Sequence, residues 1–236
     1  MQHSACIIGD ITEPGLPIRH PALFRFMHRN LLSVLHLLVI ILLPCLLWGQ
    51  DSTGVYRLPG PAAGFDINLL DKINPDTPRS AFVRQISNSA YWLPAVITLG
   101  ELGYGFIADD GPSKRYGVET GVTVGIGQLM SIGLKHLFKR PRPYMSYPQR
   151  IHPINYGTGP SFPSGHTTLA FSTAASLALT RKQWTVTLPI SLWAGSVGYS
   201  RMYLGRHFPT DVLGGLAVGV VSGIIGHWVT GRLYGD

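Results

Sequence analysis

The feature that most constrains this chain is its longest apolar run, "LLSVLHLLVIILLPCLLW", from Leu31 to Trp48. A helix of that length extends about 27 Å, which is close to the hydrocarbon thickness of a bilayer. Arg25 and Arg29 precede the run and a polar stretch comes after it, which is also the layout of a secretory signal peptide. In either case, the run directs the rest of the chain out of the cytoplasm.

The run divides the chain into four regions. Residues 1–30 are an N-terminal extension, and Met27 would be a natural start if that extension is a mis-annotated one. Residues 31–50 are a signal peptide or a first transmembrane helix, and residues 51–85 are an external segment. Residues 86–236 form the main domain.

Five further apolar stretches, each weaker than the first, predict additional helices. They cover approximately residues 86–107, 118–138, 166–180, 184–199 and 212–230. Only 13% of the residues are charged, about half the share of a typical soluble domain. Glycines four apart (Gly121 and Gly125; Gly215, Gly219 and Gly223) would let helix backbones approach closely in a membrane. We therefore expect an all-α helical bundle with six membrane-spanning segments, the first of them cleaved if it is a signal peptide; a soluble all-α protein with apolar core helices is the alternative.

The placement of charge predicts a topology. The basic residues of the expected cytoplasmic loops and tail are Lys114, Arg115, Arg181, Lys182 and Arg232. The positive-inside rule then places residues 51–85, 139–165 and 200–211 on the outer side. Lys139, Arg140 and Arg142 break that rule, and we interpret this outer basic cluster as a binding site for a negatively charged substrate.

The net charge of +7 suits nucleic acid, anionic lipid or a phosphorylated substrate. Nucleic acid ranks last, because no arginine and lysine stripe with interleaved aromatic residues is present. Cys6 and Cys45, the two cysteines, exclude a disulfide framework and a cysteine-based zinc site. No cofactor or metal is expected.

Three short segments on the expected outer side contain most of the candidate catalytic residues. They are "KHLFKRPRP" with Lys135 and Arg142, "PSGH" with Ser164, Gly165 and His166, and "SRMYLGRHFPTD" with Arg201, His207 and Asp211. The pattern is lysine, six residues, Arg-Pro; then PSGH; then Ser-Arg, five residues, His, three residues, Asp. It resembles the type 2 phosphatidic acid phosphatase (PAP2) superfamily over about residues 86–230. The resemblance implies a helical core and hydrolysis of phosphoric esters.

The chemistry of these residues favours phosphate binding. A phosphomonoester carries up to two negative charges, and its transition state spreads charge over three oxygens. Lys135, Arg142 and Arg201 supply three cations for those oxygens. Ser164 and Gly165 lie where a helix is expected to begin, which is a ready-made anion site.

His207 is the candidate nucleophile, since a neutral imidazole can attack phosphorus and form a phosphohistidine. Asp211 would hold the other ring nitrogen, and Pro209 suits the first position of a helix that begins between them. His166 is then the general acid that protonates the leaving group, and later the base that activates water.

The leading interpretation is a metal-independent phosphatase of the bacterial inner membrane, multi-pass, with its active site facing the periplasm or the outside. Its substrate would be a membrane lipid phosphate or an isoprenyl diphosphate. The alternatives are a soluble periplasmic acid phosphatase of the same superfamily, a vanadium haloperoxidase-like enzyme, and a non-catalytic lipid-binding membrane protein. The sequence does not specify the head group or the oligomeric state.

Overall fold

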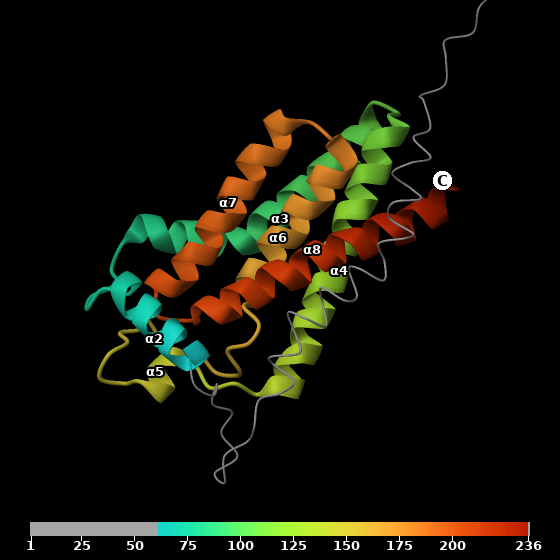
Figure 1. Ribbon diagram of the computed structural model, residues 1–236. Coiled ribbons are helices and arrows are strands. Elements are labelled where there is room, and N and C mark those ends of the chain that lie inside the picture. Colours follow the sequence, from blue (N-terminus) through green and yellow to red (C-terminus); the bar gives the residue numbers. More distant parts are fainter. Residues whose placement is uncertain (1–60, 236) are drawn as a thin grey trace, which may run out of the picture. The chain divides into compact units, whose positions relative to one another are not determined.

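The computed structural model describes residues 61–235, so the expectations for residues 1–30 and 31–50 fall outside the described range. Every regular element in that range is a helix, which confirms the all-α prediction. The helices are α2 (Pro61–Ile73), α3 (Ala81–Ile107), α4 (Gly111–Phe138), α5 (Pro143–Ser146), α6 (Gly165–Arg181), α7 (Trp184–Tyr203) and α8 (Pro209–Tyr234) (Figure 1).

The five long helices correspond to the five weaker apolar stretches of the sequence. The largest difference is at the start of α4, which begins at Gly111. The Asp110 side chain caps this helix by accepting the backbone N–H of Ser113 at 2.9 Å, and a proline follows in the first turn. Lys114 and Arg115 therefore lie in the first turns of a helix, where we had expected a loop.

Helix α6 lies at the centre of the bundle and packs against α3, α4, α7 and α8 (Figure 1). Its contact with α8 is close because glycines of α8 face it. A Cβ atom on Gly219 would lie 2.6 Å from Phe171 Cβ, and one on Gly215 would lie 2.7 Å from the Ser164 carbonyl oxygen. The small-residue prediction is confirmed for this row, whereas an added Cβ on Gly125 would meet no atom of residues 61–235 within 4 Å.

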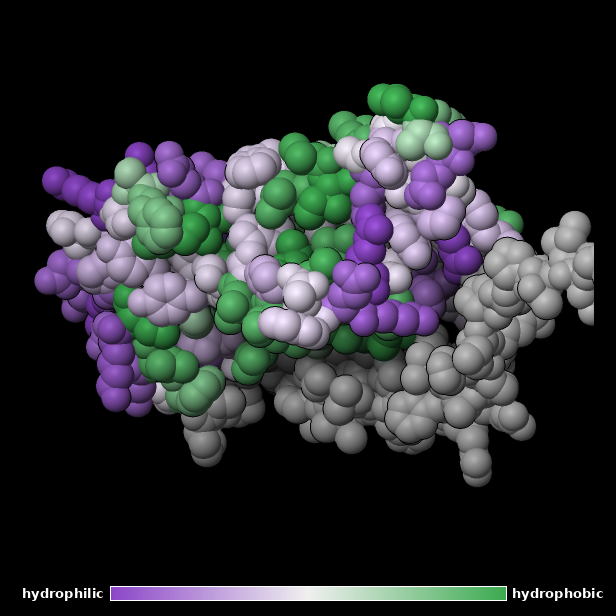
Figure 2. Space-filling view, turned by 90° about the horizontal axis from the view of Figure 1, so that it is seen from above, coloured by the Kyte–Doolittle hydropathy of each residue, from purple (hydrophilic) through white to green (hydrophobic). Residues whose placement is uncertain are grey.

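The core of the bundle is small and polar, whereas large apolar side chains point outward. Thr120, Thr167 and Ser172 are fully buried, while Leu99, Leu129 and Trp184 are each about 70% exposed. Figure 2 shows apolar side chains gathered over the middle of one face, with hydrophilic residues toward its ends. This distribution is typical of helices that pack against one another in lipid.

Helix length and composition identify fewer candidate membrane spans than the six that we expected. Within residues 61–235, only α8 is long and apolar enough to cross a bilayer by these criteria, and half of its most apolar stretch is buried. A core helix of a soluble protein can pass the same test. The expected number of six spans is therefore not confirmed.

Helices α2 and α5 and the loop after α5 cover one end of the bundle (Figure 1). Ile67, Leu70, Tyr144, Ile151 and Phe208 form a buried apolar cluster there. Asn74 then ties three segments together, because its amide donates to the carbonyl oxygens of His152 at 3.0 Å and Tyr203 at 2.9 Å. This layer contacts the end of α7 and the start of α8.

Candidate active site

The three segments identified in the sequence meet at this end of the bundle. The Ser164 backbone N–H donates to the Asp211 carbonyl oxygen at 2.9 Å. Lys135 Nζ donates to the carbonyl oxygens of Pro160 at 3.1 Å and Pro163 at 2.6 Å. These contacts bring together residues that lie up to 76 positions apart in the chain, from Lys135 to Asp211.

The PSGH turn forms the start of α6. Ser164 is the N-cap residue, and its hydroxyl oxygen accepts the Thr167 hydroxyl at 2.8 Å. The first N–H groups of a helix have no partner within it, so they are free to bind an anion. A Cβ atom on Gly165 would meet only Ser131 Oγ, at 3.8 Å, so the space beside this turn is open.

The three predicted cations surround the turn, and the protein fixes each of them. Arg142 is 8% exposed, and its Nε donates to the Gly159 carbonyl oxygen at 3.1 Å. Arg201 is 6% exposed, and its NH1 donates to Ser87 Oγ at 2.5 Å. Lys135 uses two of its three N–H donors on the loop that leads into PSGH, which leaves one for a ligand. This arrangement places positive charge in a fixed geometry around the helix start.

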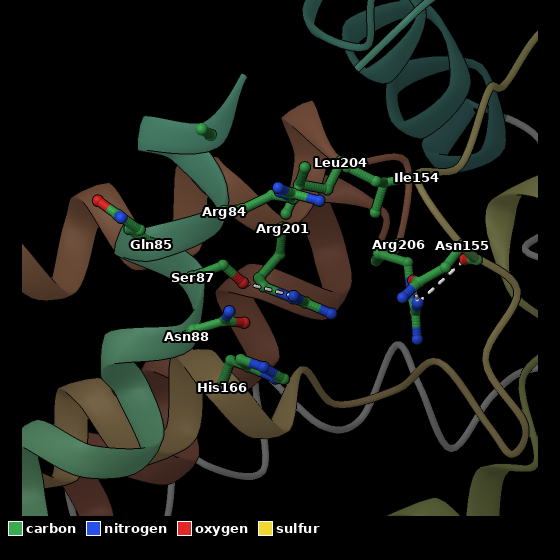
Figure 3. A pocket seen from close by; sticks show the side chains of 11 residues that line it. Arg84, Gln85, Ser87, Asn88, Ile154, Asn155, His166, Arg201, Leu204 and Arg206 are labelled. Carbon is green, nitrogen blue, oxygen red and sulfur yellow. Dashed lines mark hydrogen bonds between the residues drawn. The ribbon is translucent and has the colours of Figure 1, made fainter. Parts of the chain in front are cut away.

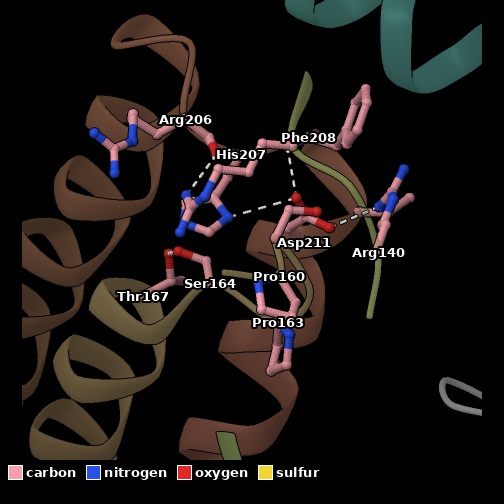
Figure 4. Close-up of polar contacts among 12 residues, drawn as sticks. Arg140, Pro160, Pro163, Ser164, Thr167, Arg206, His207, Phe208 and Asp211 are labelled. Atoms are coloured by element: carbon pink, nitrogen blue, oxygen red, sulfur yellow. Dashed lines mark hydrogen bonds and ion pairs between the residues drawn. The ribbon is translucent and has the colours of Figure 1, made fainter. Parts of the chain in front are cut away.

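His207 lies just before Phe208, the N-cap residue of α8, so it precedes a helix as expected. It is almost fully buried. Its Nδ1 lies 3.5 Å from Asp211 Oδ2, within ion-pair distance, and no hydrogen bond to Nδ1 is formed within residues 61–235 (Figure 4). Burial, together with the positive charges of Arg201, Arg142 and Lys135, lowers the pKa of His207 well below its ordinary value. The free imidazole is therefore neutral at pH 7.

Asp211 is fixed by contacts on both of its oxygens. Oδ2 accepts the backbone N–H of Phe208 at 2.9 Å, and Oδ1 accepts Arg140 NH1 at 2.6 Å (Figure 4). Arg140 also donates to Asp66 Oδ2 at 2.6 Å. Our interpretation of the basic cluster as a substrate site is therefore wrong for Arg140, because two buried carboxylates bind its guanidinium group. Lys139 is exposed at the end of α4, and Arg142 is the one of the three that belongs to the site.

His166 lies at the edge of a cavity of about 460 Å³ (Figure 3). Its ring contacts the Tyr91 ring edge-on, with 4.4 Å between the ring centroids. Arg84, Arg201 and Arg206 also line the cavity, and none of the residues between 61 and 235 that line it is acidic. Arg206 is oriented by the backbone carbonyl and side-chain oxygens of Asn155.

Several residues of the site were missed from the sequence. Arg206 directly precedes His207, and that adjacency was a usable signal. Ser87 and Tyr91 lie in an apolar stretch that we interpreted only as a helix, and Asp66 lies in a segment without a recognisable motif. Their contacts with Arg201, His166 and Arg140 depend on the fold, so no local pattern points to them.

A metal site is not apparent among these side chains. Within residues 61–235, no group of three or more His, Cys, Asp or Glu residues is arranged to share a metal ion. The three cations around PSGH, Lys135, Arg142 and Arg201, suit an anionic ligand.

The fold and the site together define a class of protein: a helical bundle with a basic anion site and a His–Asp pair at one end. Residues 116–234 match the model of the PAP2 superfamily, which is half of the chain, and the chain belongs to that superfamily. The recognition made from the three sequence segments is thereby confirmed.

Individual relatives agree with this membership. The chain is 30% identical over 114 residues to the undecaprenyl-diphosphatase BcrC of Bacillus subtilis. The aligned residues cover 48% of this chain and 57% of that protein. It is 30% identical over 198 residues to a lipid A 1-phosphatase of Porphyromonas gingivalis. This alignment covers 79% of this chain and 41% of that protein. The chain thus spans about half the length of these relatives.

A solved structure supports the fold. The crystal structure of a transmembrane PAP2 type phosphatidylglycerolphosphate phosphatase from Bacillus subtilis matches with a TM-score of 0.61 and 20% sequence identity. The match covers 85% of this chain and 96% of that structure. The helical arrangement of this protein is therefore that of transmembrane PAP2 phosphatases.

Proposed function

We propose that this chain is a metal-independent phosphatase that acts on a membrane lipid phosphate or an isoprenyl diphosphate through a phosphohistidine intermediate. The observation that carries the proposal is the setting of His207, a neutral imidazole backed by Asp211 and surrounded by Lys135, Arg142 and Arg201. A nucleophile needs a free lone pair, and the three cations can hold the phosphate that it attacks. The matched family and the names of the relatives support the same activity.

The proposed reaction has two steps. In the first, His207 Nε2 attacks phosphorus, the bond from phosphorus to the leaving oxygen breaks, and His166 gives that oxygen a proton. In the second, His166 removes a proton from water, the water oxygen attacks phosphorus, and the bond to Nε2 breaks. Lys135, Arg142 and Arg201, with Ser164 and the N–H of Gly165, stabilise the charge on the phosphoryl oxygens in both steps. Inorganic phosphate and the dephosphorylated substrate are the products.

The cavity beside His166 bears on the choice of substrate. In the proposed mechanism His166 protonates the leaving group, so the leaving group occupies the cavity that His166 lines. Arg84 and Arg206 add positive charge there, which favours a leaving group that is itself anionic. This supports an isoprenyl diphosphate, whose leaving group is a prenyl phosphate, over an ester whose leaving group is a neutral alcohol.

The surface supports a membrane location over a soluble periplasmic enzyme. Large apolar side chains on the long helices are exposed, and the core between these helices is small and polar. In the proposed topology, the PSGH end of the bundle faces the periplasm and the α3–α4 and α6–α7 connections face the cytoplasm. The basic residues Lys114 and Arg181 lie at that cytoplasmic end.

The test is phosphate release by the purified full-length protein in detergent, with excess EDTA, from a prenyl diphosphate and a prenyl monophosphate of the same chain length. We expect full activity in EDTA, because fixed cations replace the metal, and a higher kcat/KM for the diphosphate. Loss of activity on chelation that a divalent ion restores would overturn the metal-independent mechanism. A preference for the monophosphate would overturn the substrate assignment and leave the mechanism standing.

A further inference from the structure

Asp66, Arg140 and Asp211 form a buried chain of charges that reaches from α2 to the candidate nucleophile. Arg140 donates to Asp66 Oδ2 and to Asp211 Oδ1, each at 2.6 Å. The side chains of Asp66 and Asp211 are at most 1% exposed, and that of Arg140 is 5% exposed. Asp211 Oδ2 then lies 3.5 Å from His207 Nδ1. Charges this deeply buried are costly unless they are paired, and here each one is paired.

The net charge of the group formed by Asp66, Arg140 and Asp211 matters as much as its geometry. A single Arg140–Asp211 pair would be neutral as a unit and would present little net charge to His207. Asp66 supplies a second negative charge, so that the three groups together carry one net negative charge. The imidazole of His207 becomes positively charged as its Nε2 bonds to phosphorus, and a net negative group beside Nδ1 stabilises that charge.

We propose that Asp66 is a positioning residue for catalysis: acting through Arg140, it holds Asp211 in its orientation and preserves the negative charge that Asp211 presents to His207. This rests on the proposed function, in which His207 is the nucleophile. Asp66 lies in α2, outside the residues 116–234 that match the family model. Helix α2, which helps to cover this end of the bundle, thus contributes a residue to the site.

The structure also shows why the role of Asp66 can be separated from simple folding. Arg140 has a contact that does not depend on Asp66, since it lies over the Phe208 ring, 4.1 Å from its centroid. It also donates to Thr210 Oγ1 at 2.7 Å, and the Thr210 hydroxyl in turn donates to Asp66 Oδ2 at 2.6 Å. Asp66 Oδ1 accepts the Thr210 backbone N–H at 2.9 Å, and the amide oxygen of an asparagine can do the same. Asp66→Asn therefore removes the charge and the acceptor for Arg140 and the Thr210 hydroxyl, and it keeps the contact with the Thr210 backbone N–H.

The experiment compares Asp66→Asn with a matched control on the same helix. Asp71 forms an ion pair with Arg150 at 2.8 Å, but both partners are about 40% exposed, and this pair has no contact with Arg140 or Asp211. Rapid-quench measurements with radiolabelled substrate should show phosphoenzyme formation about 10- to 100-fold slower in Asp66→Asn, a loss typical of removing an outer partner of a reactive group. KM should change little, because no substrate contact is removed. Asp71→Asn should match the wild type.

Two further measurements make the outcome decisive. In an Asp211→Asn background, Asp66→Asn should have little additional effect, because Asp66 acts only through Asp211; additive losses would mean an independent structural role. Binding of inorganic vanadate, measured by its protection against thermal unfolding, needs no turnover and should weaken in Asp66→Asn but not in Asp71→Asn. If Asp66→Asn and Asp71→Asn behave alike in both assays, the inference is overturned while the proposed function stands. A wild-type protein that neither hydrolyses substrate nor binds vanadate would overturn both.

Discussion

At the scale of single residues, the two histidines of the site have different surroundings that suit different tasks. His207 is 2% exposed, lies among three cations and is backed by a carboxylate. His166 lies at the edge of the cavity against the Tyr91 ring, where a leaving group can reach it. A buried neutral imidazole suits attack on phosphorus, and an imidazole that lines a cavity suits proton transfer to a group bound there.

This difference predicts distinct kinetic defects. His207→Ala should abolish turnover and any trapped phosphoenzyme. His166→Ala should lose about 10²–10⁴-fold with a poor leaving group such as a lipid alkoxide, because general acid catalysis is lost. With p-nitrophenyl phosphate, whose leaving group needs little proton help, it should give a burst of nitrophenol followed by slow turnover, with phosphate on His207. Rapid quench with radiolabelled substrate measures each step.

His152→Ala is the control for these variants, because the His152 ring is 40% exposed and its nearest acidic partner is Asp76, at 3.7 Å. It should retain wild-type kinetics. Label found on His166, or turnover by His207→Ala, would reverse the assignment of roles.

At the scale of elements, the contact between α6 and α8 sets the position of the site, because Ser164 lies at the start of α6 and Asp211 in the first turn of α8. The glycine row of α8 lets these helices approach until Gly215 lies beside the Ser164 carbonyl oxygen. An added methyl group in this row would separate the two ends that form the site.

A pair of identical substitutions tests this packing. In Gly219→Ala the new Cβ would lie 2.6 Å from Phe171 Cβ, so we expect a loss of about 1–3 kcal/mol in the free energy of unfolding. In Gly125→Ala the new Cβ meets nothing within 4 Å, so we expect no loss and a gain of up to about 1 kcal/mol from helix propensity. Unfolding of both proteins in the same detergent measures the difference. Equal stability of the two variants would show that the α8 row does not limit the approach of the helices.

The elements also show how far the sequence predicts the fold. All five long helices were predictable, because apolar stretches of helical length occur between polar turns. The break before α8 was predictable as well, since Pro209 stands at its first turn. The start of α4 was not, because "SKRYG" is polar and charged, and the Asp110 cap outweighs that composition.

The site was predictable only where its residues form local patterns. Lys135, Ser164 and His207 belong to fixed spacings within short segments. The role of Arg140 was misassigned because its charge alone does not show what it pairs with. Its partner Asp66 lies 74 residues away and is brought to it only by the packing of α2 over the end of the bundle.

At the scale of the whole molecule, the bundle has two different ends. The α3–α4 and α6–α7 connections lie at one end, and α2, α5 and the candidate site lie at the other (Figure 1). Between them, side chains such as Leu99 and Leu129 are exposed on the long helices. If these helices cross a bilayer, the two ends lie on opposite sides of it.

Labelling in intact cells tests this topology. Single cysteines at Ala108, Gln183 and Ser146, in a background that lacks Cys6 and Cys45, replace residues that are exposed in the structure. An impermeant maleimide should label the cysteine at Ser146 and should not label those at Ala108 and Gln183 until the cells are opened. Equal labelling of all three positions in intact cells would favour a secreted soluble protein.

The loop between α5 and α6 has one further consequence, which concerns the pace of turnover. Gly157 is fixed to the Tyr144 hydroxyl through both its N–H, at 2.9 Å, and its carbonyl oxygen, at 2.8 Å. The backbone N–H of Ser161 donates to the Arg140 carbonyl oxygen at 2.7 Å, so the segment is anchored at successive points up to the PSGH turn. These anchors hold the segment against the bundle, and in many enzymes the opening of a lid is the slowest event of the cycle. In the proposed reaction, the release of product would then need no opening of this segment.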